Sequence, residues 1–134
     1  MEFQYQPRSV AGICIHGNTL FIAKRNSGGA MGERWEFPGG KVEPPESDQE
    51  ALIREYEEEF GVPITVGPCI ASAVFEHHHQ TRYLYAYLVE FREQQFVMTE
   101  HTQWRWATLD EIEKLPFADS DKKLLTDLYK FVRK

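Results

Sequence analysis

Residues 40–62 read GKVEPPESDQEALIREYEEEFGV, and within this stretch Glu55, Glu58 and Glu59 follow a glycine-rich turn. On an α-helix these glutamates are spaced i, i+3 and i+4, so their carboxylates share one face. Like charges at this spacing repel one another by roughly 0.2–0.5 kcal/mol per pair. A hard cation removes that repulsion, and Mg²⁺ and Mn²⁺ prefer clustered oxygen ligands. The stretch therefore predicts a helix that carries a metal site, with Mg²⁺ as the expected ion and Mn²⁺ as the alternative.

Local patterns bound this helix at both ends. Ser47 and Glu50 have the spacing of a capping box, which marks a helix start, and Gly61 suits the position that ends a helix. A separate apolar stripe can pack inward: Leu52, Tyr56 and Phe60. The segment is thus expected to be helical from about Ser47 to Gly61.

The residues around the helix add to the expected site. Arg54 lies four residues before Glu58 and can hold that carboxylate, or the one of Glu46, in a fixed orientation. Upstream, residues 37–41 (FPGGK) form a tight loop whose glycines let backbone groups approach an ion or a phosphate. The ordinary alternative is a glutamate-rich helix that only faces solvent. The spacing of the whole segment favours the metal site.

This spacing matches a family motif. Five residues separate Gly40 from Glu46, and seven more precede the run REYEEEFGV at residues 54–62. The arrangement resembles the Nudix box, which reads Gly-x5-Glu-x7-Arg-Glu-aliphatic-x-Glu-Glu-x-Gly-aliphatic. The one departure is Tyr56 at an aliphatic position, where it is still a core-facing hydrophobe. The resemblance implies an α/β fold, a Nudix-type α/β/α sandwich with a mixed β-sheet between helices, and a single domain over residues 1–134.

The similarity continues outside the box. Residues 35–44 (WEFPGGKVEP), Trp106-x-x-Leu109 and residues 115–119 (LPFAD) resemble the MutT branch and the related CTP pyrophosphohydrolases. These enzymes cut nucleoside triphosphates between the α and β phosphates and release the monophosphate and pyrophosphate. The resemblance implies Mg²⁺-dependent hydrolysis of 8-oxo-dGTP, or of a pyrimidine triphosphate such as CTP or 5-methyl-dCTP, in cleansing of the nucleotide pool.

Two other functions stay open. A Nudix hydrolase can instead cleave ADP-ribose or dinucleoside polyphosphates, but the proline or tyrosine expected downstream of the box is replaced by residues 77–80 (HHHQ). A non-catalytic Nudix domain can sense a nucleotide, but such domains usually lose box glutamates that this chain keeps. Both alternatives are therefore less favoured.

The resemblance also implies roles for single residues. The metal ligands would be the Gly40 carbonyl and the carboxylates of Glu55, Glu58 and Glu59. The phosphates would contact Arg25 and Lys41. Arg54 and Glu46 would hold the metal ligands in position without binding the metal themselves. The water that attacks phosphorus would lose its proton to a carboxylate, most simply that of Glu55.

A polar loop near residue 100 supplies a second candidate base. Glu100 stands where MutT-like enzymes place a further glutamate that binds metal or acts as a base, although most loop glutamates are simply solvated. The adjacent His101 is another possible base because its unperturbed pKa lies near neutrality.

The base-binding residues are predicted less firmly. Asp119 stands where MutT-like enzymes present an amide or acid to the base edge, and with Ser120 it can equally cap the last helix. The aromatic residues that could flank a base, or simply fill the core, are Trp35, Phe37, Phe75 and Tyr83. His77 opens a run of three histidines that reads as a polar hairpin tip, and it can border the base pocket.

Composition limits the class of protein and its partners. A chain of 134 residues with a net charge of −6 suits a single domain and argues against broad nucleic-acid or anionic-membrane binding. No run is long enough to span a membrane, and the first ten residues lack the apolar core of a signal peptide. Cys14 and Cys69 are expected as reduced thiols. We therefore expect a cytoplasmic protein that is a monomer or homodimer, and the Nudix resemblance implies that its partner is a small nucleotide.

Apolar runs and turn residues predict the remaining elements. The expected strands cover residues 10–15, 20–23, 64–75, 83–91 and 103–108, with a short segment at residues 35–37, and the first pair is joined by a turn at residues 17–18. The expected helical segments after the box cover residues 109–115 and 119–132.

Overall fold

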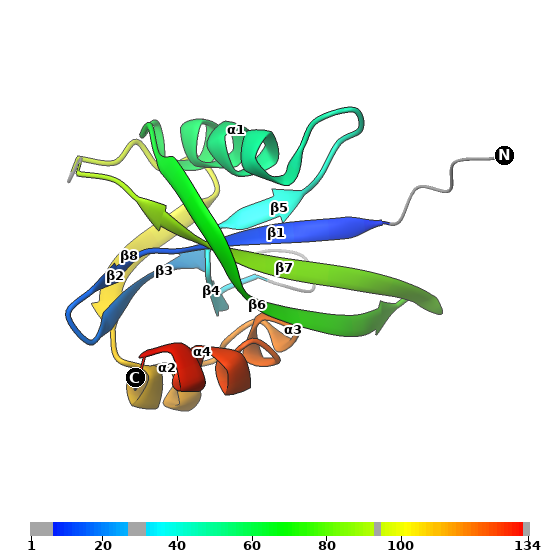
Figure 1. Cartoon of the computed structure of the whole chain (residues 1–134). Coiled ribbons are helices and arrows are strands. Elements are labelled where there is room, and N and C mark those ends of the chain that lie inside the picture. Colours follow the sequence, from blue (N-terminus) through cyan, green and yellow to red (C-terminus); the bar gives the residue numbers. More distant parts are fainter. Residues whose placement is uncertain (1–6, 27–31, 93–94, 133–134) are drawn as a thin grey trace, which may run out of the picture.

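The protein is a layered structure in which two β-sheets lie between one helix and a group of shorter helices (Figure 1). The computed structural model describes residues 7–26, 32–92 and 95–132. The strands are β1 (Arg8–Ile13), β2 (Ile15–His16), β3 (Thr19–Arg25), β4 (Trp35–Glu36), β5 (Gly39–Lys41), β6 (Thr65–His77), β7 (Gln80–Glu90) and β8 (His101–Ala107). The helices are α1 (Asp48–Phe60), α2 (Leu109–Lys114), α3 (Asp119–Lys122) and α4 (Leu125–Val132).

Each sheet has four strands. The first has the order β5-β1-β7-β6, and the second has the order β2-β3-β4 with β8 paired to β3. The β1–β7 pair is parallel and the other pairs are antiparallel, so the first sheet is mixed. Helix α1 covers one side of the sheets, and α2, α3 and α4 cover the other (Figure 1). This arrangement confirms the predicted α/β sandwich.

Both faces of the central strands are buried. On β1, Val10 packs into the cluster under α1, whereas Ala11 packs into the cluster under α2–α4. On β3, Phe21 packs into the cluster under α1, and Ile22 packs into the cluster under α2–α4. Strands covered on both faces read as continuous apolar runs rather than as alternating ones, which is why these two segments are recognisable in the sequence.

Helix α1 is held at both ends by the predicted residues. Ser47 and Glu50 exchange both hydrogen bonds of a capping box, and Gly61 ends the helix in the left-handed region at φ 65°. Tyr56 is fully buried, and its hydroxyl donates to the carbonyl of Gly12 at 3.3 Å. A Cβ on Gly12 would come within 2.4 Å of that hydroxyl oxygen, so Gly12 makes room for tyrosine at a position where the motif has an aliphatic residue.

Two predicted elements are divided in the structure. The strand expected at residues 10–15 is broken at Cys14, because Ile13 pairs with Leu88 in one sheet and Ile15 pairs with Leu20 in the other. The helix expected at residues 119–132 is split into α3 and α4. The amide of Leu124 donates to the carbonyl of Asp121, three residues back, and this tighter turn interrupts the α-helical pattern.

The β6–β7 hairpin ends in the histidine run. His78 and His79 form its tip with φ values of 52° and 62°, as expected for a two-residue turn that follows the twist of the strands. Cys14 is buried and Cys69 is exposed, both as free thiols. Among the helices of the described residues, none has the length and apolar character needed to cross a membrane.

Candidate active site

An acidic cavity of about 290 Å³ opens between the glycine loop and α1. Its walls include the predicted ligand and phosphate-binding residues Arg25, Gly40, Lys41, Glu55, Glu58, Glu59 and Glu100. They come from β3, from the neighbouring β5 and α1, and from the segment before β8 much later in the sequence. The fold therefore gathers these side chains around one space, as their sequence pattern predicts.

Gly40 and Glu55 are in close contact at the centre of this cavity. Gly40 pairs with Val10 across β1 and β5, and the face of β5 that it occupies is pressed against α1. A Cβ on Gly40 would lie 2.6 Å from Cδ of Glu55 and 2.7 Å from its Oε2. Only glycine leaves room for this carboxylate beside the backbone, which is the arrangement needed if carbonyl and carboxylate share an ion.

Arg54 organises the carboxylates from the side of the helix. Its Nη1 donates to Oε1 of Glu55 at 2.6 Å and to Oε2 of Glu58 at 3.3 Å. Its Nε and Nη2 hold both oxygens of Glu46 at 3.1 and 2.7 Å, and Nη2 also donates to the carbonyl of Lys41. The hydrogen bond from Arg54 lowers the pKa of Glu46. The guanidinium thus links the helix to the phosphate loop in a planar, forked geometry.

Glu59 is the buried member of the glutamate cluster. It is 3 % exposed, and its Oε1 has no hydrogen-bond partner. Burial, a hydrogen bond with Glu55 and the charge of Glu36 raise the pKa of Glu59 to about 10. A divalent cation can displace the proton from such a carboxyl and stabilise its ionised form, since clustered oxygen donors are what Mg²⁺ binds. The donor set therefore fits such an ion.

A buried pair beside this cluster was not predicted from the sequence. The ring of His101 is fully buried, stacks on Phe60 at 5.0 Å, and hydrogen-bonds through Nε2 to Oε2 of Glu36 at 2.7 Å. The same Glu36 oxygen accepts from Nη1 of Arg25 at 3.0 Å, and Arg25 reaches Glu100 at 3.3 Å. Potential ligand atoms of Glu36, Glu59 and His101 lie within 4.8 Å of one another, so this group too could hold a metal. Arg25 already neutralises the charge of Glu36, so a metal ion is less needed there. This favours a metal position between Glu59 and Glu55.

A second cavity of about 150 Å³ adjoins the acidic one, and both are lined by Arg25, Gly39 and Gly40. It lies between the first sheet and α3. The walls that are new to this cavity include Phe37, Phe75, Leu84, Ser120 and Asp121.

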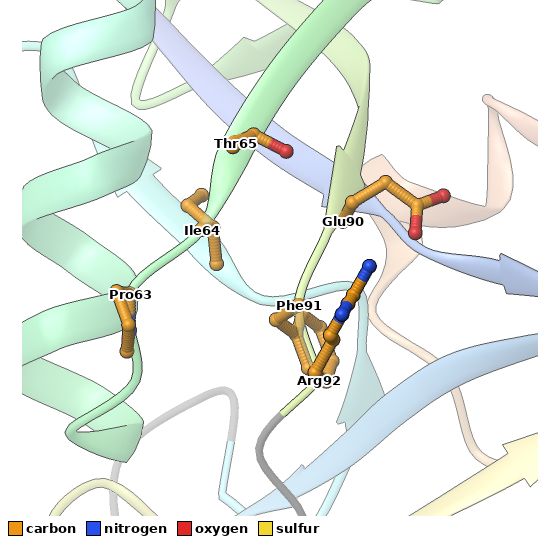
Figure 2. A pocket seen from close by; sticks show the side chains of 6 residues that line it. All are labelled: Pro63, Ile64, Thr65, Glu90, Phe91 and Arg92. Atoms are coloured by element: carbon orange, nitrogen blue, oxygen red, sulfur yellow. The ribbon is translucent and has the colours of Figure 1, made fainter.

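The most voluminous of these cavities lies away from both. It measures about 590 Å³ and sits between the start of β6 and the end of β7 (Figure 2). Its walls are Pro63, Ile64, Thr65, Glu90, Phe91 and Arg92. None of the box carboxylates lines it, so its size does not make it the candidate active site.

The comparisons with known proteins identify the family. Residues 6–128 match the model of the NUDIX domain. The chain belongs to the Nudix family. It is 35 % identical over 116 residues to the CTP pyrophosphohydrolase of Escherichia coli K12, covering 87 % of this chain and 86 % of that one. It is 29 % identical over 126 residues to an 8-oxo-dGTP diphosphatase of Buchnera aphidicola, covering 92 % and 93 %. The solution structure of the E. coli ORF135 protein superposes with a TM-score of 0.83 at 33 % identity, covering 94 % and 90 %.

Asp119 lies apart from both cavities of this Nudix domain. Its side chain is 80 % exposed and pairs with Nη1 of Arg34 at 3.2 Å. Its predicted role as a helix cap is wrong, because Ala118 is the N-cap residue and α3 has no side-chain cap. The helix start is fixed instead by the backbone, since the amide of Ala118 donates to the carbonyl of Trp35 at 2.9 Å.

Asp121, two residues further along α3, lines the second cavity, and Asp119 does not. Asp121 is buried, and its Oδ2 accepts the backbone N–H of Phe37 at 2.9 Å. Burial and the nearby charge of Glu36 raise the pKa of Asp121 to about 7. Sequence reasoning missed it because two acids stand two residues apart on a short helix, and only the packing of α3 decides which one points inward.

The other predicted base-site residues are divided between cavity and core. Phe37 and Phe75 line the second cavity. Trp35 lies in the hydrophobic core under α2–α4, and Tyr83 is half-buried on β7 outside the cavity lining. His77 ends β6, is exposed, and lines neither of the two adjoining cavities. The buried ring of His101 likewise does not line the acidic cavity.

Proposed function

We propose that this Nudix hydrolase cleaves a nucleoside triphosphate, with Mg²⁺, to the monophosphate and pyrophosphate. The observation that supports this most directly is the pair of adjoining cavities. One is lined by carboxylates, Arg25 and Lys41, and the other by Phe37 and Phe75. Phosphates need cations, and a base needs flat apolar walls, so the two cavities suit the two ends of one nucleotide.

The proposed metal ligands are the residues already gathered at the acidic cavity: the carbonyl of Gly40 and the carboxylates of Glu55, Glu58, Glu59 and Glu100. When bound there, Mg²⁺ supplies neutralisation of phosphate charge and a lowered pKa of coordinated water. Mn²⁺ has the same preference for oxygen ligands and is expected to substitute.

The protein's own contribution is to orient groups and to move one proton. Glu55 accepts the proton of the attacking water, because Arg54 holds its carboxylate in place through a hydrogen bond of 2.6 Å. Glu100 is the alternative base, but its side chain is 54 % exposed and is held only at 3.3 Å by Arg25. Arg25 and Lys41 offset charge on the non-bridging phosphate oxygens, and attack at the β-phosphorus yields pyrophosphate.

The relatives support two classes of base. One is named a CTP pyrophosphohydrolase and another an 8-oxo-dGTP diphosphatase, and we propose that this chain acts on a nucleotide of one of these two kinds in cleansing the nucleotide pool.

The test is release of pyrophosphate from 8-oxo-dGTP, CTP and 5-methyl-dCTP with Mg²⁺. We expect Glu55→Gln to lower kcat at least a hundredfold while nucleotide binding persists, as for loss of a general base. Glu57→Gln is the matched control, because Glu57 lies on the same helix but is exposed and does not line the cavity. No pyrophosphate from any triphosphate, or equal activity of the Glu55→Gln protein, would contradict the proposal.

A further inference from the structure

His101 and Glu36 adjoin Arg25 from the two neighbouring strands. Arg25 on β3 is the register partner of His101 on β8, at a point where the register shifts, and Glu36 lies on β4 along the other edge of β3. Nε2 of His101 lies 2.7 Å from Oε2 of Glu36, and the same oxygen accepts from Nη1 of Arg25 at 3.0 Å. His101 thus reaches Arg25 through Glu36, although its own ring lines neither of the adjoining cavities.

The direction of the His101 hydrogen bond follows from the contacts of Glu36. Oε2 of Glu36 already accepts from a guanidinium, and an ionised carboxylate has no proton to donate. Nε2 of His101 is therefore the donor. Nδ1 of His101 is buried and has no hydrogen-bond partner among the described residues, and the ring is stacked on Phe60 at 5.0 Å. The hydrogen bond shown for this buried ring is thus the one to Glu36.

The N–H of His101 limits how Glu36 can engage Arg25. A carboxylate and a guanidinium frequently pair through two parallel hydrogen bonds, which occupy two N–H donors. With Oε2 of Glu36 held by His101, the structure shows one bond from Arg25 to Glu36, and Nη2 of Arg25 reaches Glu100 at 3.3 Å instead. A guanidinium has five N–H donors, so donors of Arg25 remain for an anion in the acidic cavity.

We propose, on the basis of the function proposed above, that His101 is a positioning residue that keeps Arg25 available to the phosphates by holding Glu36. Without this donor, Glu36 would turn both oxygens to Arg25 and draw the guanidinium away from the acidic cavity. A second route would run through Glu59, whose Oε1 lies 3.7 Å from Nε2 of His101. That separation is too long for a hydrogen bond, so the effect is expected at Arg25.

The experiment compares His101→Asn with His101→Gln, using the triphosphate that the wild-type protein hydrolyses fastest. Both variants lose the ring that stacks on Phe60. The amide nitrogen of Gln lies as many bonds from Cα as Nε2 of His, whereas that of Asn lies one bond closer. We expect His101→Asn to lower kcat/KM about tenfold or more, mainly through KM, and His101→Gln to stay within about threefold of wild type. No loss in His101→Asn, or equal losses in the two variants, would overturn the proposal.

A double-mutant cycle tests whether the effect passes through Arg25. Arg25→Lys removes the fork that Glu36 could engage with both oxygens, so adding His101→Asn to it should change kcat/KM less than about twofold. An undiminished loss in that background would overturn the proposal. A tenfold rise in the Mg²⁺ concentration for half-maximal activity of His101→Asn would do the same, because it would place the effect at Glu59. If His101→Asn does not fold, His101→Phe keeps a stacked ring without the donor and replaces it in the cycle.

His16→Asn is the matched control for loss of a stacked histidine. His16 also stacks on an aromatic ring, that of Trp106 at 4.2 Å, but it is exposed and lines neither cavity. This variant should keep the kcat/KM of the wild-type protein. A loss equal to that of His101→Asn would overturn the proposal.

Failure of the proposed function has a different outcome. If no triphosphate is hydrolysed, calorimetry with inorganic pyrophosphate and Mg²⁺ measures anion binding without turnover. Binding that is about tenfold weaker in His101→Asn and retained in His101→Gln would support the positioning of Arg25 in a non-catalytic site. Equal binding by the three proteins, or absence of binding by the wild-type protein, would overturn it.

Discussion

Gly40→Ala should disable the active site with little effect on the fold. The added Cβ would lie 2.6 Å from Cδ of Glu55, so the carboxylate must retreat by about 0.8 Å to reach an ordinary contact at 3.4 Å. The residue needs no left-handed backbone, and the obstructed group is the far end of a side chain. A misplacement of about 1 Å at a reacting group can cost on the order of 10²-fold in rate. We expect kcat to fall about a hundredfold, and the free energy of unfolding to change by less than about 1 kcal/mol.

The assay is steady-state pyrophosphate release, with chemical denaturation of the same preparations. Gly39→Ala is the adjacent contrast, because its Cβ would lie 2.0 Å from the backbone oxygen of Val10, which cannot move aside. That variant should lose about 3 kcal/mol or more of stability. Adding Glu55→Asp to Gly40→Ala shortens the obstructed side chain and should restore part of the lost rate relative to Glu55→Asp alone. Activity of Gly40→Ala within threefold of wild type would refute the reasoning.

Three further predictions concern charge. A lysine at position 54 cannot bridge Glu46 and Glu55 at once, as the guanidinium of Arg54 does. Arg54→Lys should therefore lower kcat about 10–100-fold at saturating Mg²⁺. An unchanged kcat would contradict the role of Arg54 in positioning the carboxylates. The pKa of Glu59 is raised to about 10 without an ion, so Mg²⁺ binding at pH 7 should release about one proton. Calorimetry in buffers of different ionisation heat measures the number of protons released. The Glu59→Gln protein should release none. Burial raises the pKa of Asp121 from an ordinary 3.8 to about 7, so the contribution of Asp121 to stability should fall by at most roughly 4 kcal/mol as pH rises from about 4 to 7. Denaturation of Asp121→Asn should show a smaller decrease over that range.

The box helix could be predicted because its determinants are local. The capping box of Ser47 and Glu50, the terminal Gly61 and the spacing of Glu55, Glu58 and Glu59 all lie within a few residues of one another. These patterns predict which backbone groups at the ends of the helix are hydrogen-bonded and which face of the helix is charged. Distant residues add contacts at the two ends of this helix: Arg8 donates to Asp48 at 2.6 Å, and the amide of Val97 donates to the carbonyl of Phe60 at 3.0 Å.

The base side of the site depends on contacts that the sequence does not display. Trp35 and Ala118 are joined by backbone hydrogen bonding, and this contact sets where α3 begins. The start of a helix sets the direction of every side chain on it, so Asp121 points inward and Asp119 points to Arg34. The pairing of Glu36 with His101 is equally non-local, because 65 residues separate them.

The two arginines at the site divide the carboxylates between them, and this division leaves Glu59 for the proposed metal. Arg54 engages the glutamates on one side, and Arg25 engages Glu36 and Glu100 on the other. Within the part of the chain that the structure describes, no lysine or arginine is within ion-pair distance of Glu59. The most buried carboxylate of the cluster is thus the one without an arginine or lysine partner, and the proposed triphosphate substrate would add negative charge beside it. A divalent cation that displaces the proton of Glu59 would offset the charge of both groups, so the proposed ion would also make binding of the anionic substrate favourable.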